Sequence, residues 1–229
     1  MNQLEQDVER VLASLGPLPA PRPRPTLVAL SGLPGSGKST VADVLRRRVP
    51  IVVLQSDRIR KLLVPVPQYS TEESARVFAA LYGALERLLR AGIPALVDAT
   101  NLQERYRAPL VDIAARTGAR FVLVWVEASE DAIYRRLTAR TTGVRAGYDV
   151  SDAGIDVYQM MRARVEPIQG DHIVVNTDRD ITPAVETLAR MIEEDDNPAV
   201  TGRRDGQPQL PSPAPQEDAS PGGLVREAP

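Results

Sequence analysis

A glycine-rich segment between an apolar run and a helical stripe constrains the fold of this chain more than any other feature. Leu27–Ser31 is apolar, and Gly32–Thr40 reads Gly-Leu-Pro-Gly-Ser-Gly-Lys-Ser-Thr. Val41, Val44 and Leu45 then begin an amphipathic helical stripe. The segment completes the pattern G-x-x-x-x-G-K-[ST] in the strand–loop–helix context that confirms it. The sequence therefore predicts a loop that binds phosphate groups.

Each residue type in this loop has a physical role. Glycines let main-chain N–H groups turn inward without a Cβ clash, and the start of the helix adds partial positive charge. Lys38 would bridge the β- and γ-phosphates, and the Ser39 hydroxyl would bind Mg²⁺. We therefore expect ATP and Mg²⁺ as cofactors. The expected nucleotide-binding residues in the loop are Gly32, Gly35, Ser36, Gly37, Lys38, Ser39 and Thr40.

The alternative is a glycine-rich turn with an accidental lysine. Lys38 and Lys61 are the only lysines in the 229 residues. With so few lysines, the full pattern would arise by chance in roughly one such chain in a thousand. The phosphate-binding interpretation is therefore preferred.

From Thr26 onward, short apolar runs alternate with longer amphipathic stretches, which is typical of strand–helix repeats around a parallel sheet. Strands are expected at Leu27–Ser31, Ile51–Gln55, Ile93–Asp98, Arg120–Val126 and His172–Asn176. Helices are expected at about Gly37–Arg48, Arg58–Leu63, Thr71–Ala91, Gln103–Thr117, Glu130–Arg140, Ser151–Val165 and Thr182–Glu194. We predict an α/β fold of the P-loop NTPase type. It would be a three-layer α/β/α sandwich with a central, mainly parallel five-stranded sheet and a helical lid.

The two ends of the chain differ from this repeating region. Apolar residues at helical spacing and then alternating prolines predict a helix and an extended linker over residues 1–25. The helix would either pack on the domain or serve as a handle for a partner. Residues 26–196 would form the P-loop domain. Pro, Gly, Gln, Ser and charged residues without periodicity predict a disordered tail over residues 197–229, passive or used for docking.

Composition excludes several classes of site. Lys and Arg number 28 against 30 Asp and Glu, so the net charge of −2 provides no overall electrostatic footprint for nucleic acid or an anionic membrane. There are no cysteines, which excludes disulfides and thiolate chemistry. No apolar run reaches the ~18 residues of a membrane span. We expect a cytoplasmic protein with no membrane partner; the oligomeric state is not indicated.

Two acids follow neighbouring strands. Asp57 comes directly after the second strand and shares a face of a helical turn with Arg60, at the sheet edge where ligands bind in such folds. The alternative is a helix-capping aspartate with an exposed ion pair. Asp98 closes the third strand and is followed by Ala99-Thr100-Asn101; an acid in that position can hold Mg²⁺ or its waters. Helix capping is again the alternative.

An arginine-rich helix follows the fourth strand. Arg136 and Arg140 stand four residues apart, on one face of the expected helix Glu130–Arg140. Together with the loop at residues 141–147 they could close over a triphosphate and clamp it. Arginine is also the usual surface cation of this chain, so a solvated face is the alternative.

These motifs, in this order, resemble those of small P-loop kinases related to polynucleotide 5′-hydroxyl kinases, zeta toxins and gluconate kinases. The resemblance covers about Thr26 to Glu194. It implies that Asp57 is the general base that takes the proton of the substrate hydroxyl. It also implies that Arg60 contacts the substrate or the transferring phosphate. Lys38 is a further catalytic candidate, because of the bridge between the β- and γ-phosphates that the loop pattern predicts for it.

The same resemblance implies roles for the remaining candidates. Arg136 and Arg140 would stabilise transition-state charge. Asp98 and Asn101 would bind metal-associated water or the acceptor, and Thr177 would lie near the adenine.

The expected function is ATP- and Mg²⁺-dependent transfer of the γ-phosphoryl group to a hydroxyl of a small molecule or of a nucleic-acid 5′ end. A basic channel leading to Asp57 would favour the polymer, and a closed pocket would favour the metabolite. The net charge of −2 leans slightly towards the metabolite. The alternative is a regulatory P-loop NTPase without an acceptor substrate.

Overall fold

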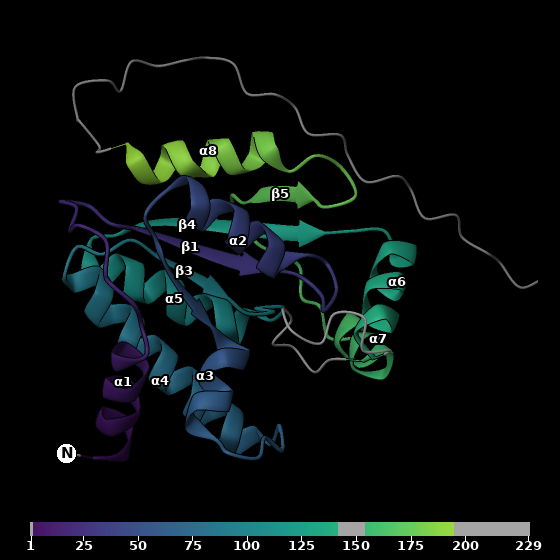
Figure 1. Ribbon diagram of the computed structural model, residues 1–229, viewed down its shortest axis with the longest axis horizontal. Helices are drawn as coiled ribbons and strands as arrows, with labels where there is room; N and C mark the ends of the chain where they lie inside the picture. The colour runs from purple at the N-terminus through teal and green to yellow at the C-terminus, as the bar shows by residue number, and fades with distance from the viewer. Residues whose placement is uncertain (1, 142–153, 195–229) are drawn as a thin grey trace, which may run out of the picture. The chain divides into compact units, whose positions relative to one another are not determined.

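The computed structural model describes residues 2–141 and 154–194, with residues 140 and 141 as main chain only. Within these ranges, five strands form one parallel sheet in the order β2-β3-β1-β4-β5 (Figure 1). The strands are β1 (Thr26–Ser31), β2 (Val52–Gln55), β3 (Ala95–Asp98), β4 (Arg120–Glu127) and β5 (Ile173–Asn176). The helices of the same ranges are α1 (Gln3–Ala13), α2 (Lys38–Arg48), α3 (Ser56–Leu63), α4 (Thr71–Arg90), α5 (Glu104–Thr117), α6 (Glu130–Thr141), α7 (Ile155–Arg162) and α8 (Thr182–Glu193). The predicted α/β fold is confirmed.

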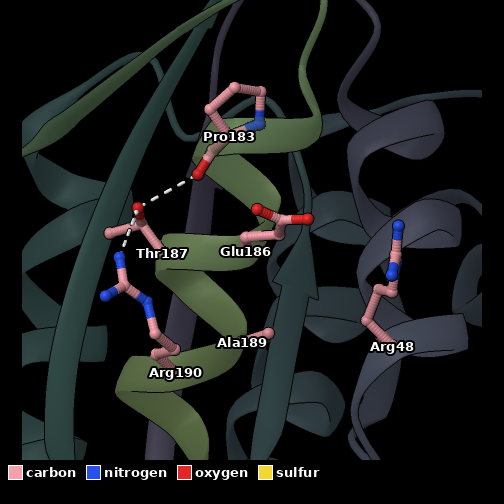
Figure 2. A pocket seen from close by; sticks show the side chains of 6 residues that line it. All are labelled: Arg48, Pro183, Glu186, Thr187, Ala189 and Arg190. Carbon is pink, nitrogen blue, oxygen red and sulfur yellow. Dashed lines mark hydrogen bonds between the residues drawn. The ribbon is translucent and has the colours of Figure 1, made fainter.

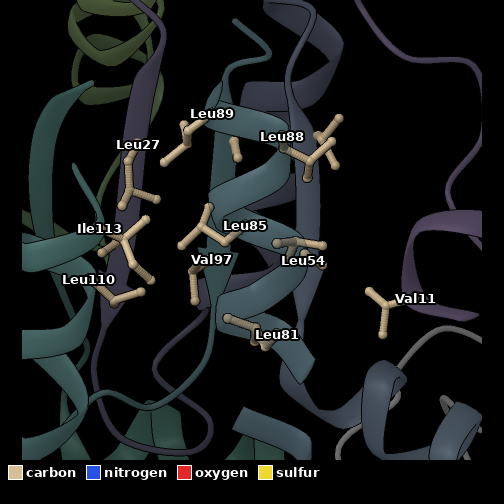
Figure 3. Close-up of a cluster of buried hydrophobic side chains, with 14 of the residues drawn as sticks. Val11, Leu27, Leu54, Leu81, Leu85, Leu88, Leu89, Val97, Leu110 and Ile113 are labelled. Carbon is tan, nitrogen blue, oxygen red and sulfur yellow. The ribbon is translucent and has the colours of Figure 1, made fainter. Parts of the chain in front are cut away.

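The central strand β1 is buried along its whole length, because helices cover both faces of the sheet. Leu27 and Ala29 belong to a core cluster with residues of α1, α3, α4 and α5 (Figure 3). Val28 and Leu30, which point to the other face, belong to a cluster with residues of α2 and α8. This alternation produces the three layers that the sequence predicted.

The element boundaries differ from the expected ones at two positions that matter. β3 begins at Ala95 and not at Ile93, since Pro94 has no N–H to donate, and its carbonyl accepts the N–H of Val52 (3.0 Å). α3 begins at Ser56, directly after β2 and two residues earlier than expected. The early start places Asp57 in the first turn of the helix, at the carboxyl edge of the sheet.

The N-terminal helix α1 packs on the domain. Val8 and Val11 are buried in the same cluster as α3 and α4. The linker after α1 joins the fold through the Arg22 N–H, which donates to Gly92 O (2.8 Å). Among the helices of the described residues, none has the length and apolar character needed for a bilayer crossing.

Some predictions fall on residues outside the described ranges. They are the tail over residues 197–229, the lid loop after residue 141 and the first residues of the helix expected at Ser151–Val165. The later part of that helix is present as α7.

Candidate active site

The phosphate loop runs from the end of β1 to the start of α2, as predicted. Gly32, Gly35 and Gly37 have φ angles of +151°, +79° and +99°, which side-chain-bearing residues rarely adopt. A Cβ on Gly32 would lie 2.3 Å from Val126 O, and one on Gly37 would lie 2.9 Å from Thr177 Cγ2. The loop therefore keeps this shape only with glycine at these positions.

Lys38 and Ser36 show that the loop is built around polar groups. Lys38 Nζ donates to the carbonyls of Gly32 and Leu33, each at 2.9 Å, so its ammonium lies over the loop. Ser36 Oγ is buried and has no hydrogen-bond partner among the described residues. An orphaned buried hydroxyl in a cradle of glycines fits a ligand rich in oxygen atoms, such as a triphosphate.

Two residues from other elements hold the phosphate loop: Thr177, which directly follows β5, and Arg136 of α6. Thr177 Oγ1 donates to Ser36 O (2.7 Å) and accepts from Arg136 Nη1 (2.9 Å). Arg136 also donates to Gly35 O (3.1 Å) and to Thr177 O (3.1 Å). Its guanidinium lies 3.7 Å from the carboxylate of Asp178. Arg136 therefore ties α6, the phosphate loop and the segment after β5 together. The side chain of Arg140 lies outside the described residues.

The ends of β2 and β3 meet at the carboxyl edge of the sheet. Gln55 and Asp98 are register partners, and Gln55 Nε2 donates to Asp98 Oδ2 (3.1 Å). Asp98 is 7% exposed and lies next to β1, which leads into the phosphate loop. The loop after β3 contacts the phosphate loop directly, because Gly32 N–H donates to Thr100 O (3.0 Å).

Asn101 is placed differently from the other candidates. It is 1% exposed with φ +45°, and its Nδ2 donates to Leu30 O (2.7 Å). The main-chain carbonyl of Asn101 accepts a hydrogen bond from Ser31 Oγ (3.0 Å). Asn101 thus joins β1 to the loop after β3. Thr100, and not Asn101, lines the cavity described below.

Arg60 makes a buried ion pair with Glu73, which lies on another helix, α4. It is 6% exposed and donates to the carboxylate of Glu73, while its Nη2 lies 3.3 Å from Ser74 Oγ. Its guanidinium lies 4.8 Å from the centroid of the Tyr69 ring. Its Nε is buried with no hydrogen-bond partner among the described residues.

Glu73 organises the segment before α4. Its Oε2 accepts the main-chain N–H groups of Gln68 (2.7 Å) and Tyr69 (3.2 Å), while Oε1 accepts from Arg60. The Gln68 N–H, and after it the Arg60 guanidinium, hold the pKa of Glu73 below its ordinary value against the opposing effect of burial. Glu73 is therefore a carboxylate that stays charged and links Arg60 to residues 68 and 69.

One cavity of about 1010 Å³ joins these groups. The predicted residues that line it are Gly35, Gly37, Lys38, Ser39, Thr40, Asp57, Arg60 and Asp98. Gly32, Ser36, Asn101, Arg136 and Thr177 are not among its lining residues; of these, Thr177 and Arg136 hold the loop through hydrogen bonds to the carbonyls of Ser36 and Gly35. The sheet therefore brings the phosphate loop and both strand-end acids to one space.

The same cavity has a second half that sequence reasoning missed. Its walls include Tyr69, Phe78 and Tyr106, with Arg105 and Arg164 beside them. The rings of Phe78 and Tyr106 lie 4.9 Å apart, and the Arg105 guanidinium lies 4.9 Å from the Tyr106 centroid. The sequence has only 2 Phe and 6 Tyr. Because aromatic residues are so few, those that lie close in the chain to a polar motif could have indicated this part of the cavity.

Metal binding would depend on few protein groups. Within the described ranges, no cluster of three or more His, Cys, Asp or Glu side chains could hold a metal ion. Mg²⁺ commonly binds through one or two protein oxygens together with phosphates and water. Ser39 and Asp98, which both line the cavity, fit that donor set.

A second hollow, of about 510 Å³, lies between α2 and α8 (Figure 2). Its lining residues are Arg48, Pro183, Glu186, Thr187, Ala189 and Arg190. Thr187 Oγ1 donates to Pro183 O (3.0 Å) and accepts from Arg190 Nη2 (3.4 Å), so these polar groups pair within α8. It contains neither the phosphate loop nor a strand-end acid and is not the candidate site.

Fold and site together define a P-loop protein with a ligand cavity at the carboxyl edge of a parallel sheet. A comparison with protein families matches residues 27–168 to a family described as AAA domain. The chain belongs to this family.

Three solved structures share the fold. The APS kinase CysC of Mycobacterium tuberculosis, in complex with AMPPNP and APS, is 24% identical with a TM-score of 0.58, and the match covers 76% of this chain and 100% of that one. Kti12 of Chaetomium thermophilum, in complex with ADP-AlF3, is 20% identical with a TM-score of 0.57, covering 72% and 98%. A gluconokinase of Sinorhizobium meliloti is 21% identical with a TM-score of 0.52, covering 75% and 96%. At these identities the likeness shows a shared fold, and at that level the resemblance to small P-loop kinases is confirmed.

Proposed function

We propose that this protein is a kinase that transfers the γ-phosphoryl group of ATP to a hydroxyl of an acceptor. One observation carries the proposal: a single cavity contains the phosphate loop, Asp57 and Asp98, with further space beyond them. A phosphate site beside a half-buried carboxylate is the arrangement that phosphoryl transfer to a hydroxyl needs.

The loop side of the cavity would bind the nucleotide. Lys38 would exchange the carbonyls of Gly32 and Leu33 for the β- and γ-phosphates. Ser39 and Asp98 would hold Mg²⁺ or its waters, and the ion would supply charge neutralisation for the phosphates. Thr177 would lie towards the base, as the resemblance implies. The use of nucleotides by the CysC and Kti12 structures supports this arrangement.

The reaction itself would depend on Asp57. Its carboxylate takes the proton of the acceptor hydroxyl as that oxygen forms a bond to the γ-phosphorus. The bond between the γ-phosphorus and its bridging oxygen breaks, and ADP leaves. Arg60, whose Nε lacks a partner among the described residues, would contact the acceptor or the transferring group.

The lid arginines would neutralise charge in this step. Arg136 is held at the phosphate loop and is suited to the nucleotide end of the site. Arg140 is the candidate for the transferring phosphoryl group, on the basis of its helical spacing from Arg136.

The acceptor half of the cavity combines Arg105 and Arg164 with the rings of Phe78 and Tyr106. Cations beside aromatic rings suit an acceptor with an anionic group and a flat or apolar part. A small acidic metabolite and a nucleic-acid 5′ end both meet this description, so both belong to the proposal.

The second candidate is a regulatory NTPase without an acceptor, which the family description as an AAA domain favours. It predicts ATP hydrolysis that does not depend on Asp57. The two candidates therefore differ in a measurable way.

The test is transfer of radiolabelled γ-phosphate from ATP and Mg²⁺ to a panel of 5′-hydroxyl DNA and RNA oligonucleotides, nucleosides, sugars and aminoglycosides. Asp57→Asn should lower transfer by about 10²–10⁴-fold, since it removes a general base. Asp112→Asn, at an exposed position of α5, is the matched control and should leave transfer unchanged. ATP hydrolysis without transfer, equal in both variants, would reject the kinase in favour of the regulatory NTPase.

A further inference from the structure

Helix α1 lies before the residues that match the family, which begin at residue 27, yet it packs against helices that carry the acceptor half of the cavity. Val8 is 4% exposed and Val11 is fully buried. Both belong to the core cluster that includes α3 and α4, and Figure 3 shows Val11 beside that cluster. In Figure 1, α1 lies alongside α4 and α3. This helix therefore lies outside the residues that match the family and is still built into the core of the domain.

An ion pair between a buried carboxylate and a partly exposed arginine joins α1 to the early part of α4. The Asp7 side chain is 1% exposed, and its two oxygens accept from Arg76 Nε (2.7 Å) and Nη2 (2.8 Å). Gln3 Nε2 donates to the same carboxylate (2.9 Å). A buried carboxylate is stable only when it is paired in this way, and the bidentate geometry fixes the direction of Arg76. The contact between α1 and α4 therefore has a defined geometry, which apolar packing alone would not give it.

Other polar contacts of α1 reach the same two helices. Arg10 Nη2 donates to Leu62 O near the end of α3 (3.1 Å). Arg87, further along α4, pairs with Glu5 and Glu9. α1 therefore bridges α3 and α4 at several points along its length.

Three cavity residues of α4, namely Ser74, Ala75 and Phe78, lie within one helical turn of Arg76. Glu73 precedes Arg76 by three residues and holds Arg60 together with the N–H groups of Gln68 and Tyr69. Ser74 and Phe78, two residues to either side of Arg76, line the cavity. A rotation or shift of this part of α4 would move Glu73, and the Arg60 contact would move with it.

We propose that α1 is a positioning element for the acceptor half of the site, and that Asp7 acts through Arg76 to keep α4, Glu73 and Arg60 in place. The effect on catalysis rests on the proposed kinase function, whereas the effect on the geometry of α4 does not. The nucleotide half is formed by β1, α2 and the segment after β5, so its geometry should not depend on Asp7.

The experiment uses the full chain and three variants. Asp7→Asn removes the charge of the buried partner, and Arg76→Lys is a milder variant that keeps the charge but loses the bidentate geometry. Glu9→Gln is the matched control. Glu9 lies on α1, like Asp7, but it is exposed, and the substitution removes only its ion pair with Arg87 of α4. Hydrogen exchange of the Gln68 and Tyr69 amides, read by NMR, reports the Glu73 contact. Binding of a non-hydrolysable ATP analogue with Mg²⁺ reports the nucleotide half.

Asp7→Asn should accelerate exchange of the Gln68 and Tyr69 amides by about tenfold or more, because local opening exposes them. Amides of the phosphate loop and the affinity for the ATP analogue should stay within about twofold of the parent protein, and Glu9→Gln should leave both amides unchanged. Arg76→Lys should have a smaller effect in the same direction. If an acceptor is found, Asp7→Asn should raise its KM or lower kcat while the KM for ATP stays constant.

Two results would overturn the proposal. One is unchanged exchange at Gln68 and Tyr69 although the amides of α1 exchange faster. The other is an equal acceleration at the phosphate loop, which would indicate general destabilisation. If no acceptor on the panel is phosphorylated but the amides respond as expected, the kinase function fails and the positioning role stands.

Discussion

At the scale of single residues, the site depends on charged side chains that the fold holds in specific hydrogen bonds and ion pairs. Lys38 lies over its own loop, and Arg60 pairs with Glu73 in a largely buried setting. Removing one partner of such a buried pair leaves a charge without compensation, which is more costly than the pair's net contribution. Residues of this kind are expected to be sensitive to substitutions that exposed charges tolerate.

The two lysines of the chain provide a direct comparison. Lys38→Met should lower ATP-dependent turnover by about 10²–10³-fold, because it removes a charge aimed at the phosphates. Lys61→Met, at an exposed position of α3, should leave turnover within about twofold. The measurement is phosphate release or transfer at saturating ATP. Equal losses in both variants would contradict the assignment of Lys38.

A second residue-scale prediction concerns pH and Glu86 of α4. Hydrogen bonds from Arg116 and Arg90, both at 2.8 Å, lower the pKa of Glu86 from 4.5 to about 2. Since the folded-state pKa is depressed, the charged form stabilises the fold at pH above the unfolded value of 4.5. That contribution is lost as the pH falls from 4.5 towards about 2.

We therefore expect Glu86→Gln to be less stable than the parent protein at pH 7, by about 0.2–1 kcal/mol for a partly exposed pair. The difference should shrink at pH 3 and in about 1 M salt, which screens such charges. Urea unfolding of both proteins at the two pH values measures it. A difference that does not change with pH would show that the carboxylate charge is not its cause.

At the scale of elements, α4 connects the core, the site and α1. Ser70 caps the helix, with its side chain accepting the N–H of Glu73 (3.1 Å). Ser-x-x-Glu is the sequence of a capping box, in which the glutamate would reach back to the main chain of the serine. Here the described contacts of the Glu73 side chain include Gln68 N–H, Tyr69 N–H and Arg60, so a local capping pattern also serves the site.

The contact between α1 and α4 predicts that a Gly→Ala substitution in α4 lowers the stability of the fold, whereas such a substitution usually raises it. Gly83 lies under Val8, and a Cβ there would be 2.6 Å from Val8 Cγ2. Gly→Ala in a helix ordinarily stabilises by about 1 kcal/mol. Gly83→Ala should instead destabilise by about 1–3 kcal/mol, because Val8 is β-branched and buried and cannot easily turn away.

In a Val8→Ala background the same Gly83→Ala change should stabilise by about 0.5–1 kcal/mol, as in an ordinary helix. Urea denaturation of the four proteins forms a double-mutant cycle that isolates the contact. Stabilisation by Gly83→Ala in both backgrounds would show that α1 does not pack as closely as described.

At the scale of the whole molecule, the parallel sheet determines where ligands act. The order β2-β3-β1-β4-β5 puts the ends of β2 and β3 beside the loop that follows β1. Residues far apart in the chain therefore share one cavity, and a bound nucleotide would contact several elements of the fold at once. Binding to the folded state alone must raise its stability.

MgATP at about 100 times its Kd should add about 2.7 kcal/mol and raise the Tm by roughly 5–10 °C. Ser39→Ala should lose most of the part of this shift that depends on Mg²⁺, because the hydroxyl is the expected ligand. Thermal unfolding with ATP and with EDTA separates the two parts. AMP is the control ligand; a shift with AMP as large as that with ATP would contradict a site centred on the β- and γ-phosphates.

Sequence alone was sufficient for the features that depend on neighbouring residues. The phosphate loop was predictable because glycine at residues 32, 35 and 37 permits a main-chain shape closed to other residues. The strands and helices followed from apolar periodicity, which is also local. Placing Asp57 and Asp98 at one edge needed only the rule that the strands run parallel.

The tertiary structure alone decided which side chains meet. Asn101 was expected to bind metal-associated water or the acceptor, and nothing in the sequence indicated that its side-chain Nδ2 donates to the carbonyl of Leu30, 71 residues away. The Glu73 partner of Arg60 and the Asp7–Arg76 pair between α1 and α4 also had no signal in local spacing. The physical reason is that periodicity and glycine content act within a few residues, whereas these contacts form only after the order of the strands and the packing of the helices on them have brought distant segments together.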